Sequence, residues 1–203
     1  MYFDYAGHDQ SLEPLRKGLA QILITDLATA GTVRVVERDR LQAVLDEQKL
    51  GKSGKLDAST AARIGKLLGA RYLVLGSYFD AMGAFRVDAR LVKVETGEIV
   101  KSIGASGKSD DFLALEQKIA EGLRAAVENL APVDARRPEQ GAEGRPGPKR
   151  PQRLNTGTAV TYGRALVAVD SGDKKTARAL FRDVLAAQPD FELAQRDLDR
   201  LIQ

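Results

Sequence analysis

Hydrophobic and polar residues follow two different periods along residues 1–130, and the period changes several times. Helical spacing of leucine and isoleucine in residues 11–31 predicts a helix with Ser11 as its N-cap and Gly31 at its C-terminal end. The same criterion predicts three more helices in this part of the chain, at 38–49, 58–69 and 110–130. β-Branched and aromatic residues gather in extended segments at 32–37, 71–79 and 84–92.

The segment 84–92 alternates strictly, with apolar residues at every second position from Phe85 and charged residues between them. This pattern predicts a strand with one solvent-exposed face. The nearly continuous apolar run at 71–79 predicts a central strand covered on both faces, and Thr96-Gly97 predicts the tip of a hairpin. The element order β-α-β-α-α-β-β-β-α predicts an α/β sandwich on a mixed sheet. Its later strands are antiparallel, and one edge begins at Met1.

Residues 131–155 interrupt these patterns. This segment holds five of the seven prolines of the chain and three glycines. Proline lacks a backbone donor and disfavours helix at the preceding residue, so the segment is predicted to be a flexible linker. Three helices are predicted after it, at 157–171, 173–187 and 190–202. The predicted organisation is therefore an α/β domain at 1–130, a Pro-rich linker at 131–155 and a small all-α module at 156–203.

The charge of the chain narrows the function. The net charge is +3, and it arises in the linker, which has six basic and three acidic residues. Neither folded part is basic, and the linker holds no aromatic residue for base stacking, so no nucleic-acid partner is expected. The chain has no cysteine and one histidine, His8, so no metal site or thiol chemistry is expected. No apolar run reaches the length of a transmembrane helix.

Three short motifs were weighed as sites. "GKSGK" at 51–55 lacks the first glycine and the strand-loop-helix context of a phosphate-binding loop. "IGKLLG" at 64–69 has one residue too many for the glycine clamp of RNA-binding modules, and its Ile64, Leu67 and Leu68 are predicted to be core. Asp4, His8 and Asp9 lie together at a strand end, but Asp9 is better explained as a helix cap. The sequence therefore predicts no catalytic or cofactor-binding residue and no enzyme.

Three stretches of residues 1–130 form a recognisable series: "VRVVERDRLQAVLDEQKLG", "AARIGKLLGARYLVLGSY" and "RVDARLVKVETGEIV". In this order they resemble the soluble domain of the curli assembly/transport component (CsgG-like) family and the related N-terminal domains of TolB-type proteins. Related domains also occur in lipoprotein activators of penicillin-binding proteins and in flagellar outer-membrane accessory proteins. The matched residues are fold residues, so the resemblance implies a fold and an envelope setting more than an activity.

The resemblance also bears on the beginning of the chain. Family members start this domain with a longer strand that follows a signal or lipoprotein peptide, whereas here "MYFDY" covers only the second half of that strand. A start at an internal methionine would explain this, and a naturally short edge strand is the alternative. Pore-forming relatives carry two long hairpin insertions, but residues 80–84 are a short connection. No membrane pore is therefore expected of this chain.

Residues 158–191 are similar to one tetratricopeptide repeat. Ala177, Phe181 and Pro189 occupy the small, aromatic and proline positions of the repeat, although Thr161 and Ala168 replace its tryptophan and tyrosine. One repeat buries little apolar surface, so the module is expected to need docking or self-association. The residues expected to face a partner-binding groove are Tyr162 and Leu166.

Together these features favour a non-catalytic cell-envelope assembly or secretion accessory protein, or a scaffold, that acts through protein–protein contacts. Its expected partners are other envelope proteins or further copies of the chain. Its expected location is the periplasm, associated with the outer membrane, if an export signal precedes Met1; a tether to that membrane would lie in the same missing segment. The alternatives are a cytosolic two-module adaptor and, less favoured, a nucleotide-dependent enzyme that uses residues 51–55.

Overall fold

The computed structural model describes residues 1–29, 33–49, 58–81, 83–108, 111–130 and 154–202. Four strands form one mixed sheet in the order β1-β2-β3-β4. β1 pairs in parallel with β2, whereas β2–β3 and β3–β4 are antiparallel. The mixed sheet, its antiparallel later strands and its edge near the first residues are as the sequence predicts. The strands are β1 (Asp4–Tyr5), β2 (Tyr72–Ala81), β3 (Ala84–Lys93) and β4 (Ile99–Lys108).

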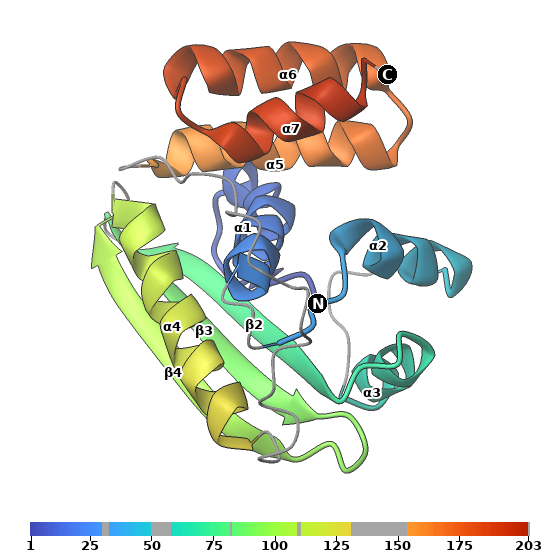
Figure 1. Ribbon diagram of the computed structural model, residues 1–203. Helices are drawn as coiled ribbons and strands as arrows, with labels where there is room; N and C mark the ends of the chain where they lie inside the picture. The colour runs from blue at the N-terminus through green and yellow to red at the C-terminus, as the bar shows by residue number, and fades with distance from the viewer. Residues whose placement is uncertain (30–32, 50–57, 82, 109–110, 131–153, 203) are drawn as a thin grey trace.

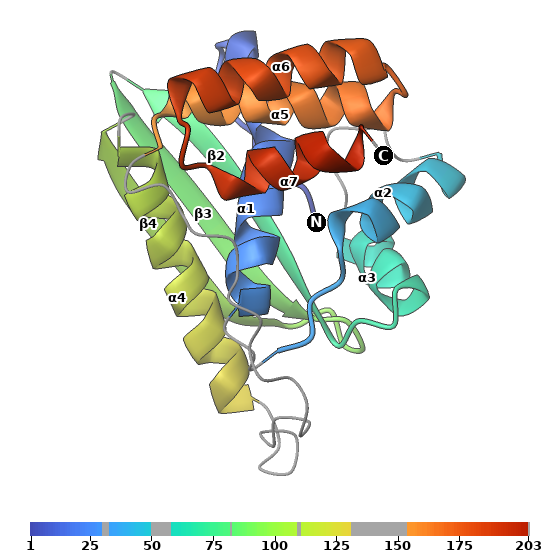
Figure 2. The same cartoon turned by 45° about the horizontal axis from the view of Figure 1, so that its top comes forward.

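Helices surround this sheet on one side and at one end (Figure 1). Four of them belong to the first part of the chain: α1 (Leu15–Thr29), α2 (Arg38–Glu47), α3 (Ala58–Leu67) and α4 (Phe112–Leu130). α1 and α4 pack against each other, and α4 covers β3 and β4, while α3 contacts β2. The last three helices pack on one another, above α1 in Figure 1 and across the front of α1 in Figure 2: α5 (Thr156–Asp170), α6 (Lys174–Ala187) and α7 (Glu192–Arg200).

The inner face of the sheet carries the main core. Every second residue of β3 from Phe85 to Leu91 is buried, as the alternation predicts. Four rings run across this face from strand to helix, with centroids 5.1 Å apart for Tyr5–Tyr78, 5.7 Å for Tyr78–Phe85 and 6.0 Å for Phe85–Phe112. The phenol of Tyr78 donates to the carbonyl of Leu12 at 2.7 Å, which fixes the turn before α1 to the middle of the sheet.

The outer face of the sheet is only partly covered. Arg86 and Arg90 of β3 are exposed there, as predicted. In β2, Leu75 and Phe79 pair with Arg90 and Arg86, lie on the same face, and are half-buried. The prediction that this strand is covered on both faces is therefore wrong over much of its length. The reason is that α3 reaches only one end of the outer face, where Ala61 packs with Leu73 and Val94.

The predicted strand at 32–37 does not form over its described residues, 33–37. The backbone is extended at Glu37, with φ −62° and ψ 147°, but these residues belong to no strand of the sheet. Val36 instead packs against the cluster that Leu41 and Leu45 of α2 form with α3. β-Branched residues favour an extended backbone, but a strand also needs a neighbouring edge to pair with. Here burial of the side chain stabilises the segment without a ladder.

Two local predictions also need correction. A 3-10 turn at Gln10–Leu12 precedes α1, and the carboxylate of Asp9 accepts from the amide of Ser11 at 2.9 Å. Asp9 therefore caps this 3-10 turn, in line with its predicted capping role, because its side chain reaches the amide of Ser11, whereas Ser11 lies within the turn and is not its cap. In 64–69, Ile64 and Leu68 are buried, but Leu67 is 53% exposed. Leu67 is the last residue of α3 and points away from the cluster that its two neighbours join.

The C-terminal helices are docked on the α/β part of the chain. Buried residues of α1, such as Leu15 and Leu19, belong to the same hydrophobic cluster as Ala159 and Leu166 of α5. Residues 131–153 of the predicted linker lie outside the described residues. Of its last two residues, Leu154 is buried and Asn155 caps α5, its side chain accepting from the amide of Thr158 at 2.8 Å.

Candidate functional site

α1 and α5 cross at two glycines, and we call this crossing with its flanking charges the α1–α5 contact. A β-carbon added at Gly163 would lie 2.1 Å from the carbonyl oxygen of Pro14, and one added at Gly18 would lie 3.0 Å from that of Ala159. The two helix backbones therefore approach closer than any larger residue would allow. Because the atoms that would collide belong to the backbone, neither helix can accommodate a side chain by a rotamer change.

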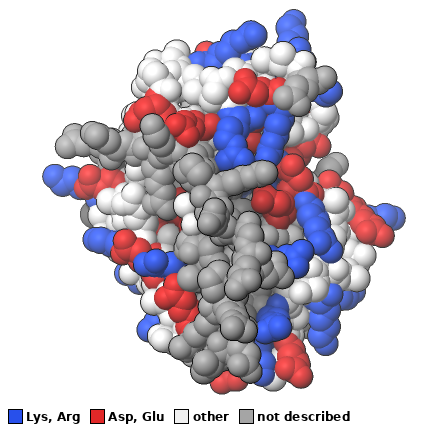
Figure 3. Space-filling model, viewed as in Figure 1, with Lys and Arg blue, Asp and Glu red and all other residues white. Residues whose placement is uncertain are grey.

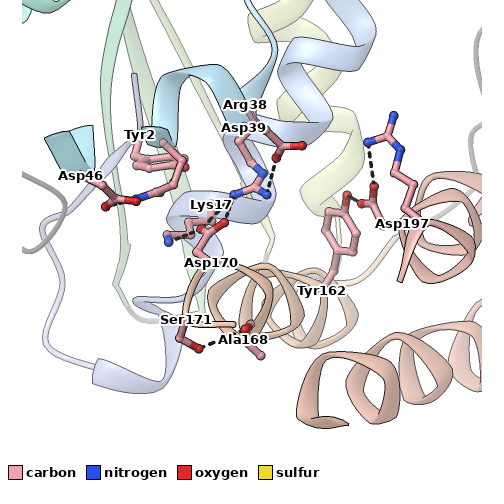
Figure 4. A network of polar contacts seen from close by, with 12 residues as sticks. Tyr2, Lys17, Arg38, Asp39, Asp46, Tyr162, Ala168, Asp170, Ser171 and Asp197 are labelled. Atoms are coloured by element: carbon pink, nitrogen blue, oxygen red, sulfur yellow. Dashed lines mark hydrogen bonds and ion pairs between the residues drawn. The ribbon is translucent and has the colours of Figure 1, made fainter. Parts of the chain in front are cut away.

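A buried ionic group closes one end of the α1–α5 contact (Figure 4). Asp170, the last residue of α5, accepts hydrogen bonds from the Arg38 guanidinium at 2.7 Å and 2.9 Å and a further one from Lys17 of α1. The side chains of Arg38 and Asp170 are 4% and 10% exposed. Arg38 also binds Asp39 at 2.8 Å, on the solvent side. We call α5, α6 and α7 together the helical unit. One carboxylate of this unit, that of Asp170, thus connects α1 and α2.

The electrostatic balance of this group favours the charged pair. Burial alone would lower the pKa of Arg38, but the carboxylate of Asp170, together with smaller contributions from Tyr2 and Asp39, outweighs burial and holds that pKa above its ordinary value. Tyr2 lies beside the pair, with the Lys17 ammonium 5.4 Å from the centre of its ring. Burial raises the pKa of Tyr2 to about 12, and its hydroxyl donates to Gln42 at 2.7 Å. The first residues of the chain therefore meet α1 and α2 next to the contact.

A second polar pair lies inside the helical unit. The hydroxyl of Tyr162 in α5 donates to the Asp197 carboxylate in α7 at 2.6 Å, and both residues are buried. Burial raises the pKa of Asp197 above its ordinary value of 3.8, and the Tyr162 hydrogen bond and the charges of Arg200 and Arg38 offset only part of this. The rings of Phe181 and Phe191 pack on Tyr162, with centroids 5.9 Å and 5.0 Å away.

Asp197→Asn is expected to change how stability depends on pH. A carboxyl whose pKa is raised on folding contributes stability that is complete below the unfolded value of 3.8 and is lost as pH rises through the folded value. Each unit of that rise corresponds to about 1.4 kcal/mol. Asparagine keeps an acceptor for Tyr162 and removes the ionisation. At pH values above the folded pKa, the free energy of unfolding of the variant should therefore have risen relative to that of the unaltered protein, as measured by urea unfolding between about pH 4 and 8. If the two proteins show the same dependence of this free energy on pH, the assignment is contradicted.

The structure places the two predicted groove residues inside the protein. Tyr162 is 0% exposed and Leu166 is 2% exposed, and both contribute to the core that joins the helices. Their role in partner binding stays a prediction, and in this arrangement their contacts are within the chain. Asp4 lies 3.9 Å from Arg16, His8 is exposed and Asp9 caps its turn, so these three residues do not form a joint site.

Sequence reasoning missed Gly18, Gly163 and Asp170. Each breaks a local rule, and that is the signal from which they could have been found. Glycine inside a helix costs up to about 1 kcal/mol relative to alanine. A carboxylate at the end of a helix faces the negative end of the helix dipole. Such residues indicate a tertiary contact that offsets their local cost, although only the structure identifies it.

No group of three or more His, Asp or Glu among the described residues is placed to hold a metal ion. None of the described helices is both long and apolar enough to span a membrane. A cavity of about 370 Å³ lies between the end of α1 and the middle of α4, with Asp26, Glu121 and Arg124 in its wall. On the face in Figure 3, basic and acidic side chains are interspersed.

Comparison with known protein families gives a match for the first part of the chain. Residues 2–81 match the family model of the curli production assembly/transport component CsgG. The match covers β1, α1, α2, α3 and β2, and so includes Lys17, Gly18 and Arg38 of the α1–α5 contact. Over this range the chain is similar to the family that the sequence analysis expects. The predicted tetratricopeptide repeat lies outside the matched range and stays a prediction.

Solved structures give a weaker likeness. The LpoB C-terminal domain from Salmonella enterica is 24% identical, with a TM-score of 0.33, and the alignment covers 36% of this chain. The same domain from Escherichia coli is 24% identical, with a TM-score of 0.32 and the same coverage. This chain spans 55% of the length of each of these two structures. A search of curated proteins found no match.

Proposed function

We propose that this protein is a non-catalytic accessory or scaffold protein of cell-envelope assembly or secretion, acting through protein–protein contacts. The observation that carries the proposal is the match of residues 2–81 to the CsgG family model. That family is defined by a production, assembly and transport component of curli. The α/β domain provides one surface for a partner and the helical unit provides a second. The α1–α5 contact holds these two surfaces in a fixed relation.

The electrostatics of the described residues support a role in contact and not in catalysis. Three buried groups with shifted pKa values have structural partners: Arg38 is paired with Asp170, Tyr78 donates to a backbone carbonyl, and Asp197 accepts from Tyr162. Catalytic acids, bases and nucleophiles often have shifted pKa values, and they must be able to reach a bound substrate. These three groups lie between packed helices or under the sheet, where they fix the fold.

Fractionation of the native host tests the proposal. The chromosomal gene would carry a C-terminal epitope tag, and osmotic shock would separate periplasm, membranes and cytosol. The tagged protein is expected in the periplasmic or outer-membrane fraction, with a cytosolic enzyme and a periplasmic enzyme as fraction markers. Recovery with the cytosolic marker alone would contradict the envelope role and favour the cytosolic adaptor.

A further inference from the structure

β4 forms the outer edge of the sheet, on the side away from α2 and α3 (Figure 1). Most of its side chains are exposed. Its buried residue, Ala105, and its half-buried Ile103 face α4 on the inner side. Among the described residues no strand pairs with the second side of β4. Ten residues of strand therefore present one row of main-chain groups to solvent.

The register shows which main-chain groups these are. The amide and carbonyl of Lys93 both bond toward the hairpin, at Glu98 and Gly97, and so point to the β4 side. The register shifts between Leu91 and Val92, but the extra residue, Val100, is on β4, so the direction still alternates along β3 and Leu91, Ala89, Val87 and Phe85 also bond to β4. Their partners are Lys101, Ile103, Ala105 and Gly107. The main-chain groups that point outward therefore belong to Ser102, Gly104 and Ser106.

Small side chains make this edge accessible to long ones from the neighbouring strand. Ser102, Gly104 and Ser106 pair with Arg90, Asp88 and Arg86 on the outer face. Arg86 already reaches over β4: it donates to Ser106 at 3.4 Å, and a β-carbon added at Gly104 would lie 3.0 Å from its guanidinium. Arg90, opposite Ser102, is exposed. Guanidinium groups can therefore lie beside the free row of main-chain groups.

The charge at this edge indicates which kind of strand could bind beside β4. The outer face of β3 and β4 carries Arg86, Arg90 and Lys108 against one carboxylate, Asp88, which Arg86 holds at 2.7 Å. β4 itself has two lysines and no acidic residue. A second copy of β4 would bring like charges together, and the segment 131–155 of this chain is also basic. Both are disfavoured, whereas an acidic strand is complementary.

We propose that β4 binds an extended, acidic segment of a partner protein, which adds a fifth strand to the sheet. Main-chain bonds at Ser102, Gly104 and Ser106 supply the affinity, and carboxylates at alternate positions of the segment contact Arg90 and Arg86 and give the selectivity. The inference rests on the proposed function, since it names a surface and a partner chemistry for the same contact role. The competing explanation of the basic edge is that the lysines of β4 serve only to prevent aggregation.

The probe is a fluorescein-labelled peptide of alternating Glu and Thr, about ten residues long to match a strand, and binding is measured by anisotropy on the full chain. A Lys/Thr peptide is the matched control. The acidic peptide is expected to bind, and its affinity should fall as salt is raised because the charges are exposed. The Lys/Thr peptide should bind at least about tenfold more weakly.

Two variants test the two parts of the surface separately. Ser102→Pro removes an outward amide without breaking a bond to β3, and should weaken the acidic peptide about tenfold, while Ser102→Ala stays within about twofold. Arg90→Glu should weaken binding of the acidic peptide and strengthen binding of the Lys/Thr peptide. This second test does not require the strand to tolerate a proline. Circular dichroism and the melting temperature confirm that each variant is folded.

The outcomes separate this inference from the proposed function. Equal binding of both peptides, no binding, or full binding by Ser102→Pro would overturn the β4 site, even if the protein fractionates with the envelope. Self-association that Ser102→Pro abolishes would show that a second copy occupies the edge, which also overturns the inference. A cytosolic location would remove the envelope role and leave a positive peptide result as evidence for the surface alone.

Discussion

Asp170→Ala is expected to lower the free energy of unfolding by about 3 kcal/mol, because it leaves a buried guanidinium without its main partner. Arg38 is 4% exposed, and among the described residues the one ion pair it keeps once Asp170 is gone is with Asp39, on its solvent side. Lys17 loses the same carboxylate. Urea denaturation followed by far-ultraviolet circular dichroism measures the loss.

Asp39→Ala is the matched control for this prediction. It removes a carboxylate that binds the same guanidinium at 2.8 Å, but the Asp39 side chain is 71% exposed. Solvent screens such a pair, so the loss should be about 0.5 kcal/mol. Equal losses for the two variants would mean that the Arg38–Asp170 pair is not buried in solution, and the α1–α5 contact would then have no ionic anchor.

Gly163→Ala is expected to lower the free energy of unfolding by about 2 kcal/mol. The added β-carbon would overlap the carbonyl of Pro14, 2.1 Å away, so α5 must move away from α1. Overpacking of this kind costs up to about 3 kcal/mol, and the better helix propensity of alanine returns up to about 1 kcal/mol. The melting temperature and the urea midpoint of the full chain measure the net effect.

Gly157→Ala provides the comparison on the same helix. The β-carbon added there would meet only the Asn155 side chain, at 3.4 Å, and Gly157 is exposed. Stability should stay within about 0.5 kcal/mol or rise slightly, as for an ordinary helix position. A Gly163 variant as stable as the Gly157 variant would show that the helices do not cross closely at this point.

Local patterns sufficed for most elements of this fold. The alternation at 84–92 identifies β3 and its buried face, and Gly97, with φ +73°, ends the hairpin where the sequence places the tip. All three C-terminal helices lie close to their predicted ranges. These features depend on side-chain period and on backbone conformations that glycine favours, and both can be read within a few residues.

Contacts between distant segments could not be predicted in this way. The sequence indicated that the helical module needs something to dock on, but Lys17 and Asp170 are separated by 153 positions. The prediction of a strand at 32–37 is wrong for a related reason, because β-branched residues favour an extended backbone but do not specify a neighbouring strand to pair with. Tyr162 and Leu166 were predicted to face a groove, and their burial depends on α7 and α1, which the helix's own pattern does not place.

The most direct test of the account asks whether the helical unit stays on the α/β domain without a covalent connection. A specific protease site replacing residues 139–145 of the full chain would allow cleavage between α4 and α5 after folding. The two fragments are expected to co-elute in size-exclusion chromatography, and Gly163→Ala and Asp170→Ala should promote their separation. Separation of the fragments of the otherwise unaltered chain would contradict the claim that the α1–α5 contact joins the two parts into one unit.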